Sequence, residues 1–145
     1  MNNKTKISLA DIVSSQEGQN KTKQLILSRE KDQIEVTIKL TRKVDSIGLE
    51  VVFITIIPLI CDRCAIDFKN EIKVTGHREI LLEDKAATND ELALPYPHDG
   101  QLDILPIVNE EIIINLSGQH LCTENCLGLC QTCGADLNKQ TNHKC

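Results

Sequence analysis

The chain has 145 residues, a net charge of −5, seven cysteines and only three aromatic side chains. Its 42 isoleucine, leucine and valine residues exclude disorder as the main state. The acidic balance excludes a strongly basic nucleic-acid binder, and the scarcity of rings excludes a base-stacking platform. No apolar stretch has the length of a signal peptide or a membrane-spanning helix, so we expect a cytoplasmic protein. In a reducing cytosol, cysteines are more often metal ligands than disulfides.

The first half of the chain has the pattern of strands. A short ordered element is expected over residues 7–13, followed by a loop over 14–22. Apolar and polar residues alternate from Ile34 to Leu40, which predicts a half-buried strand, and residues 49–60 predict a second, more fully buried one. The alternation resumes from residue 66 to 82. Consecutive strands with short connections predict an antiparallel sheet, with a barrel-like curl as one form of it.

The second half changes character. Residues 83–100 are acidic and aperiodic, which indicates a loop. Apolar residues then recur at three- and four-residue steps, which predicts one amphipathic helix within 101–118, capped by Asp103, with Glu110 and Glu111 on its outer side. Residues 119–145 are poor in apolar side chains and need a staple to fold. The fold class expected is α+β, mainly β, with a β domain over 1–100, a helix over 101–118 that packs on it, and a cysteine-rich tail over 119–145.

The cysteines have the spacing of metal ligands. Cys61 and Cys64 form a C-x2-C pair at a strand–turn–strand junction, and Cys130 to Gly134 has the form of a zinc knuckle. The eight candidate ligands are Cys61, Cys64, Cys122, Cys126, Cys130, Cys133, His143 and Cys145. Eight ligands permit two structural zinc sites. One division places Cys130, Cys133, His143 and Cys145 in a tail site, and the other four in a site that staples the tail to the sheet; an iron–sulfur cluster is an open alternative.

Other interpretations of these residues carry less weight. A thioredoxin-like redox role needs the cysteine pair at a helix N-terminus, whereas a strand pattern follows Cys64. His77 and Glu79, followed by the Cys130 and Cys133 pair, imitate a zinc deaminase, but they lie on a strand pattern and are expected to face solvent. No H-E-x-x-H, phosphate-binding glycine loop or G-x-S-x-G motif is present. His98 and His120 are interpreted as ordinary loop residues.

Three segments together resemble a known family. They are Cys61-Asp62-Arg63-Cys64 after an aliphatic strand, the run from Leu102 to Leu116, and the tail from Leu121 to Asn138 with its C-x3-C-x3-C-x2-C spacing. This combination is similar to the bacterial YceD family, the large ribosomal RNA subunit accumulation proteins. His143 stands where family tails often have the first cysteine of a C-x-C pair. The resemblance implies a non-enzymatic factor for large-subunit (23S) ribosomal RNA accumulation and ribosome assembly, with a structural rather than a catalytic metal.

The leading hypothesis is therefore a binding module whose partner is large-subunit rRNA or a ribosome-assembly protein, with no membrane and no small-molecule substrate. Direct RNA contact would be local and would use, for instance, Lys39, Arg42, Lys43, Arg63 and Lys69, for which the alternative and default interpretation is solvated surface charge. Residues 1–80 carry 13 basic and 11 acidic side chains, and residues 81–145 carry 3 and 10, so the acidic segment 83–103 is the candidate surface for a basic protein partner. The alternative hypothesis is a zinc-dependent enzyme or a thiol redox protein that uses the C-x2-C pairs.

Overall fold

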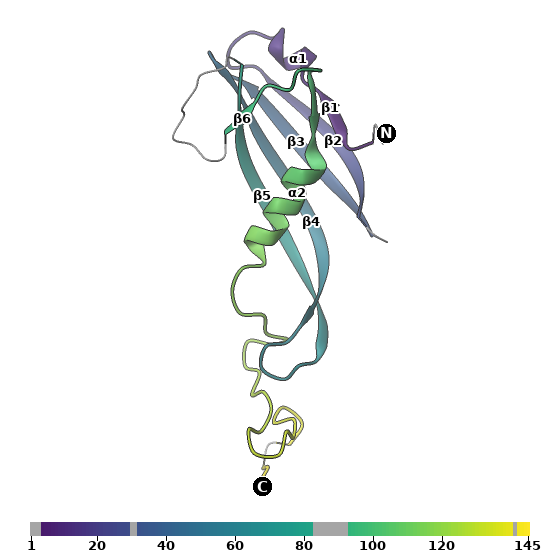
Figure 1. Cartoon of the computed structure of the whole chain (residues 1–145), viewed down its shortest axis with the longest axis vertical. Coiled ribbons are helices and arrows are strands. Elements are labelled where there is room, and N and C mark those ends of the chain that lie inside the picture. Colours follow the sequence, from purple (N-terminus) through teal and green to yellow (C-terminus); the bar gives the residue numbers. More distant parts are fainter. Residues whose placement is uncertain (1–3, 30–31, 83–92, 141) are drawn as a thin grey trace. The chain divides into compact units, whose positions relative to one another are not determined.

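The computed structural model describes residues 4–29, 32–82, 93–140 and 142–145. Its elements in chain order (Figure 1) are β1 (Lys6–Ser8), α1 (Ala10–Val13), β2 (Asn20–Arg29), β3 (Asp32–Arg42), β4 (Ser46–Ile60), β5 (Asp67–Leu81), β6 (Ala93–Pro95), β7 (Gln101–Asp103) and α2 (Ile104–Asn115). The expected α+β, mainly β class is confirmed. The chain divides into two compact units: a sheet unit, Met1–Thr55 with Lys73–Asn115, and a cysteine unit, Ile56–Ile72 with Leu116–Cys145.

The main sheet has the strand order β2-β3-β4-β5-β6. Strands β2, β3 and β4 are antiparallel, with Leu27 opposite Ile34 and Val36 opposite Phe53. Strand β6 pairs with β5 in parallel, so the sheet is mixed rather than purely antiparallel. In the described residues the sheet is open, with β2 and β6 at its two edges, so the barrel-like form that the pattern allowed is not a closed barrel. A separate small sheet pairs β1 with β7.

The core of the sheet unit is aliphatic, as the composition indicates. Every second residue of β3 is buried from Ile34 to Leu40, and the opposite parity is buried along β4 from Ile47 to Phe53. The buried apolar residues of this unit also include two from the segment around α1 and four from α2, namely Leu9, Ile12, Ile104, Ile107, Val108 and Ile112. The strand pattern therefore resulted from burial of one face only, since the intervening side chains of β3 are half-buried or exposed.

Helix α2 begins directly after Asp103, whose Oδ1 accepts the backbone N–H of Leu105 at 3.1 Å, as expected of the cap. The helix is shorter than the predicted range of 101–118, because residues 101–103 form β7 instead. The expectation that Glu111 lies on the outer side is also wrong. Glu111 is only 5% exposed and pairs with Arg78 on β5, which α2 overlies in Figure 1.

The sequence analysis missed β2 and misplaced its start in a loop over residues 14–22. Lysine, threonine and glutamine dominate the first half of this strand, which hides its alternation; only Leu27 is fully buried. Of the expected acidic loop over 83–100, residues 83–92 lie outside the described residues, and β6 occupies part of the remainder. Among the helices of the described chain, none has the length and apolar character needed to cross a membrane.

The cysteine unit has a different kind of interior. Its buried cluster consists of Cys61, Cys64 and Cys126, against which Phe68, Leu121 and Cys122 pack. Several of its large apolar side chains are exposed instead, including Ile60 at 61% and Leu127 at 61%. Thiol groups thus occupy the position that aliphatic side chains hold in the sheet unit, which agrees with the expectation that this segment cannot fold by apolar burial alone.

Candidate metal centre

The turn between β4 and β5 presents Cys61 and Cys64 as a knuckle. The N–H of Cys61 donates to the carbonyl of Ile66, and the N–H of Ala65 donates to the carbonyl of Cys61, both at 2.9 Å. Ala65 has a φ of 57°, which is the left-handed conformation that glycine tolerates best. The backbone therefore folds tightly beneath both sulfur atoms.

The tail contains a second knuckle with the same hydrogen-bond pattern. The N–H of Cys130 donates to the carbonyl of Ala135, and the N–H of Gly134 donates to the carbonyl of Cys130, both at 2.8 Å. Gly134, with a φ of 75°, takes the position that Ala65 holds in the first knuckle. The two C-x2-C pairs are thus local repeats of one backbone turn.

The structure gathers the eight sequence-predicted ligands into two groups of four. The first cluster is Cys61, Cys64, Cys122 and Cys126, and the second cluster is Cys130, Cys133, His143 and Cys145. Within each cluster the potential ligand atoms all lie within 4.8 Å of one another. This grouping is one of the divisions that the spacing allowed, and all seven cysteines are free thiols.

The first cluster has the dimensions of a tetrahedral thiolate site. Four sulfur atoms about 2.3 Å from one zinc ion would be separated by about 3.8 Å. The Cys61 and Cys126 sulfurs are 3.8 Å apart, and those of Cys64 and Cys122 are 3.6 Å apart. Cys61, Cys64 and Cys126 are at most 4% exposed and Cys122 is half-buried, so most of this cluster is enclosed. The chemistry and spacing of the donors therefore fit a zinc ion.

The second cluster is tighter and more open. The Cys130 sulfur lies 3.1 Å from that of Cys145, and His143 Nε2 lies 3.1 Å from the sulfurs of both Cys133 and Cys145. Cys133 and Cys145 are exposed. The other ring nitrogen, His143 Nδ1, is 3.1 Å from Gln140 Oε1, which favours a ring with Nδ1 protonated and Nε2 free for a metal. Three thiols and one imidazole also form a zinc-binding set.

Thiol pKa values follow from the knuckle geometry. Burial raises the pKa of Cys61, but backbone N–H groups of Cys122, Cys64 and Arg63 outweigh it and lower the pKa to about 6. In the second knuckle, the hydrogen bond with Cys145 and N–H groups of Cys133 and Thr132 lower the pKa of Cys130 to about 6.

The pKa values of Cys64 and Cys145 are shifted in the opposite direction. An N–H from Ile66 lowers the pKa of Cys64, but burial and the neighbouring cysteines raise it to about 12. Hydrogen bonds with Cys130 and Cys133 raise the pKa of Cys145 to about 11. Each cluster thus contains one thiol whose pKa is lowered and one whose pKa is raised by its neighbours, and a divalent cation would relieve the repulsion between their thiolates.

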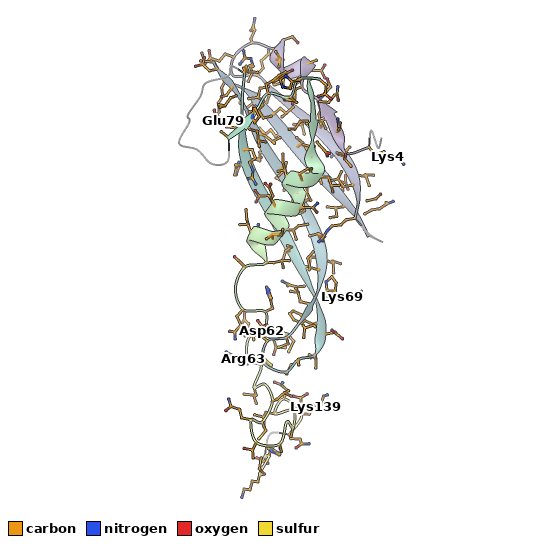
Figure 2. The ribbon with its side chains drawn as sticks, viewed as in Figure 1. Lys4, Asp62, Arg63, Lys69, Glu79 and Lys139 are labelled. Atoms are coloured by element: carbon orange, nitrogen blue, oxygen red, sulfur yellow. The ribbon has the colours of Figure 1, made fainter. Side chains whose placement is uncertain are left out.

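The two residues between the first pair of cysteines hold the tail. The N–H of Asp62 donates to the carbonyl of His120 at 2.8 Å, and the Asp62 carboxylate accepts the N–H of His120 at 2.6 Å. The Arg63 guanidinium donates to the Cys126 carbonyl at 3.0 Å. Figure 2 labels both residues at the turn that follows β4. The sequence analysis missed these roles, since no local pattern links residue 62 to residue 120.

Most of the basic residues considered for RNA contact already have partners. The Lys43 ammonium is 3.2 Å from Glu79, and the Arg42 guanidinium donates to the carbonyls of Lys43 and Val44. Lys39 stands opposite Glu50 across β3 and β4. Lys69, labelled in Figure 2, is an exposed residue of β5.

His77 and Glu79, the first two residues of the pattern that imitates a deaminase, belong to neither cluster, whereas Cys130 and Cys133 belong to the second. His77 is exposed, as expected, and its Nδ1 is 3.8 Å from a Glu50 oxygen. Glu79 accepts hydrogen bonds from Ser46 and Lys43. Their partners lie in the sheet unit and include no thiol.

The sheet unit combines an open mixed sheet with helix α2, and the cysteine unit contains two four-donor clusters, one of four thiols and one of three thiols and an imidazole. These features define a mainly β protein with a cysteine-rich unit whose donors are compatible with zinc. In a comparison with protein families, the profile of the large ribosomal RNA subunit accumulation protein YceD matches residues 51–145, a range that includes α2 and both clusters. The chain therefore belongs to the YceD family. No curated protein and no solved structure gives a significant match.

Proposed function

We propose that the protein is a non-enzymatic factor for the accumulation of large-subunit (23S) ribosomal RNA during ribosome assembly, and that it acts by binding. The observation that carries this proposal is the family match over residues 51–145, which spans both clusters. The family description names the accumulation of that RNA and no chemical reaction.

Zinc is the cofactor that best suits both clusters. The first offers four thiols at the sulfur separations of a tetrahedral site, and the second offers three thiols and an imidazole. A bound ion would stabilise the thiolates and connect the turn after β4 with the tail. We propose on this basis that the tail over 119–145 folds only with metal, as an appendage of the β domain.

A structural role of the metal is favoured over catalysis. Catalytic zinc sites usually have three protein ligands and one open position for water or substrate, whereas each cluster here has four protein donors. Cobalt substitution tests this point. Absorption bands of closed, sulfur-rich, tetrahedral coordination at both clusters would support the proposal, and an exchangeable water on the metal would contradict it in favour of the enzyme alternative.

The partner is large-subunit rRNA or a ribosome-assembly protein. The net charge of −5, together with the local pairing of Lys43 and Arg42, limits the surface available for phosphate contact. These features favour a basic protein partner, while Lys39 and Lys69 are the best remaining candidates for RNA contact.

The salt dependence of binding separates these partners. Affinity for 23S rRNA and for isolated assembly intermediates is measured at increasing salt, with Lys39→Ala and Lys69→Ala beside the parent chain. Direct RNA contact predicts a steep loss of affinity with salt, and a smaller slope in the variants. Binding to intermediates that depends little on salt supports a protein partner. No binding to either, together with unchanged 23S rRNA levels in cells that lack the protein, would contradict the proposed function.

A further inference from the structure

The side chain of Asn138 lies between the two clusters of the cysteine unit. Its Oδ1 accepts the N–H of Leu127 at 2.8 Å. Its Nδ2 donates to Asp136 Oδ1 at 2.9 Å and to the Cys126 sulfur at 3.5 Å. Cys126 belongs to the first cluster, whereas Asn138 follows the knuckle of the second. One amide group therefore connects a sulfur of the first cluster with the loop that carries the second.

The loop that positions Asn138 is built on the second knuckle. A β-bridge joins Leu129 to Asp136, and the N–H of Leu137 donates to the carbonyl of Gly128 at 3.0 Å. The N–H of Asn138 in turn donates to Asp136 Oδ1 at 3.0 Å. The fold of the second knuckle thus determines where the Asn138 amide lies.

The same loop also contacts the first knuckle through its backbone. The N–H of Leu129 donates to the Arg63 carbonyl at 3.2 Å. A Cβ added at Gly128 would lie 2.9 Å from that carbonyl oxygen, so only glycine allows this approach. Residues 126–130 therefore form a short connection between the two clusters, with Cys126 of the first cluster at one end and Cys130 of the second at the other.

We propose that Asn138 is a positioning residue that couples the two clusters, so that metal in the second cluster strengthens metal binding by the first. This inference rests on the zinc binding proposed above. An N–H donor to a thiolate stabilises its charge and fixes the orientation of the ligand. A metal ion in the second cluster would fix the loop of residues 130–138. The Asn138 amide would then reach the Cys126 sulfur without a further loss of conformational entropy.

The coupling has a defined size and direction. Loss of a residue that orients a metal ligand typically lowers metal affinity by about 10- to 100-fold. Because coupling between two binding equilibria is reciprocal, zinc in the first cluster strengthens the second by the same factor. We expect the loss of the Asn138 amide to lower the affinity of the first cluster by about 10-fold.

The test is a metal titration of the full chain against a competing chelator. The two clusters are distinguished by cobalt and cadmium spectra, since one has four sulfur donors and the other three sulfurs and one nitrogen. Asn138→Asp retains the acceptor for the Leu127 N–H but removes the donor to Cys126, and Asn138→Ala removes both. Lys139→Ala is the matched control, because this neighbouring side chain is 78% exposed and forms only a surface ion pair with Asp136.

We expect both Asn138 variants to bind two ions, with the affinity of the four-sulfur site lowered about 10-fold and Lys139→Ala unchanged. His143→Ala, which disrupts the second cluster, should lower the affinity of the four-sulfur site as well. Adding Asn138→Ala to His143→Ala should then have little further effect. If an Asn138 variant fails to fold, the His143→Ala arm still tests the coupling.

The outcomes also separate this inference from the proposed zinc binding. If the parent chain binds two ions and the four-sulfur site keeps its affinity in Asn138→Asp and His143→Ala, the coupling is wrong while the zinc sites stand. If the parent chain binds no zinc, the proposed metal sites are wrong and the coupling with them.

Discussion

Arg78 and Glu111 form a buried ion pair between β5 and α2, with Arg78 Nη1 2.5 Å from Glu111 Oε1 and both side chains at most 7% exposed. The Arg78 guanidinium also donates to the carbonyl of His77 and approaches the exposed carboxylate of Glu110 at 3.3 Å. The pair lies on the apolar face of the sheet, where an isolated charge would be costly. It therefore fixes where α2 lies on β5.

Removing one partner of this pair should destabilise the sheet unit. Glu111→Leu leaves the Arg78 guanidinium buried without its main counter-charge, so we expect the free energy of unfolding to fall by about 3–5 kcal/mol in urea denaturation. Glu110→Ala is the control, with an effect below about 1 kcal/mol, because this carboxylate is 62% exposed. Adding Arg78→Met to Glu111→Leu should restore most of the loss. Equal effects of Glu110→Ala and Glu111→Leu would contradict this account.

Gly76 should be needed for the same ion pair. A Cβ at this position would lie 2.5 Å from Glu111 Cδ, so the glycine leaves the space in which the Glu111 side chain lies on the sheet. We expect Gly76→Ala to cost about 1–3 kcal/mol of stability. The cost should largely vanish in a Glu111→Ala background, and a double-mutant cycle measures this non-additivity. Strictly additive effects would show that Gly76 and Glu111 do not interact.

The two knuckles should respond oppositely to exchange of alanine and glycine. Ala65 has a positive φ, so Ala65→Gly relieves backbone strain, although the flexibility of glycine in the unfolded chain offsets part of the gain. Gly134→Ala introduces the same strain and should cost about 1–2 kcal/mol. Nothing lies within 4 Å of a Cβ at Gly134, so the cost should be purely conformational. Thermal unfolding of the zinc-loaded variants measures both, and a loss of stability in Ala65→Gly would contradict the prediction.

Glu79 should make stability depend on pH in the acid range. Hydrogen bonds from Ser46 and Lys43 hold the pKa of Glu79 below its usual 4.5. A lowered carboxyl pKa contributes stability that is fully present above the unfolded pKa and is lost as the pH falls through the folded value. Ser46→Ala should therefore raise the pKa of Glu79, and its stability deficit should be full at neutral pH and shrink below about pH 4. Titration of the carboxyl carbon by NMR measures the pKa, and an unchanged value would remove Ser46 as the cause.

Metal removal should affect the two units differently. The sheet unit has its own aliphatic core, whereas the interior of the cysteine unit consists largely of thiols. With a chelator, we expect amide protection from hydrogen exchange to disappear over residues 116–145 and to persist in β3 and the first half of β4. Cys61→Ser is the matched variant that should weaken the first cluster without chelator. Full protection of the tail after chelation would contradict the metal dependence.

The sequence predicts those features that depend on local pattern. The alternation from Ile34 to Leu40 and the cap at Asp103 were visible because burial of one face and capping are short-range effects. The two knuckles were visible because their ligands lie three residues apart. The division of the eight ligands into two groups of four could be named from the spacing only as one possibility, because the approach of Cys64 to Cys122 depends on tertiary structure.

The buried position of Glu111 was missed for a related reason. A glutamate beside apolar helix residues is normally solvent-exposed, and its counter-charge lies 33 positions away on a strand. A signal did exist on that strand: Gly76 and Arg78 have the same parity as the buried Val74 and Ile80. An arginine on the apolar face of a strand indicates that a carboxylate from another element pairs with it. A glycine beside it indicates that this second side chain needs space on the sheet.

Because the two clusters differ in solvent exposure, reagents in solution reach their thiols in a defined order. Cys133 and Cys145 are open to solvent, whereas Cys61, Cys64 and Cys126 are enclosed. A chelator or an oxidant in solution therefore reaches Cys133 and Cys145 first, whereas Cys61, Cys64 and Cys126 react only after the protein around them has opened. A metal ion bound in the first cluster would then be lost at a rate set by local unfolding rather than by chemical reactivity, and the cysteine unit would come apart stepwise, starting at its exposed thiols.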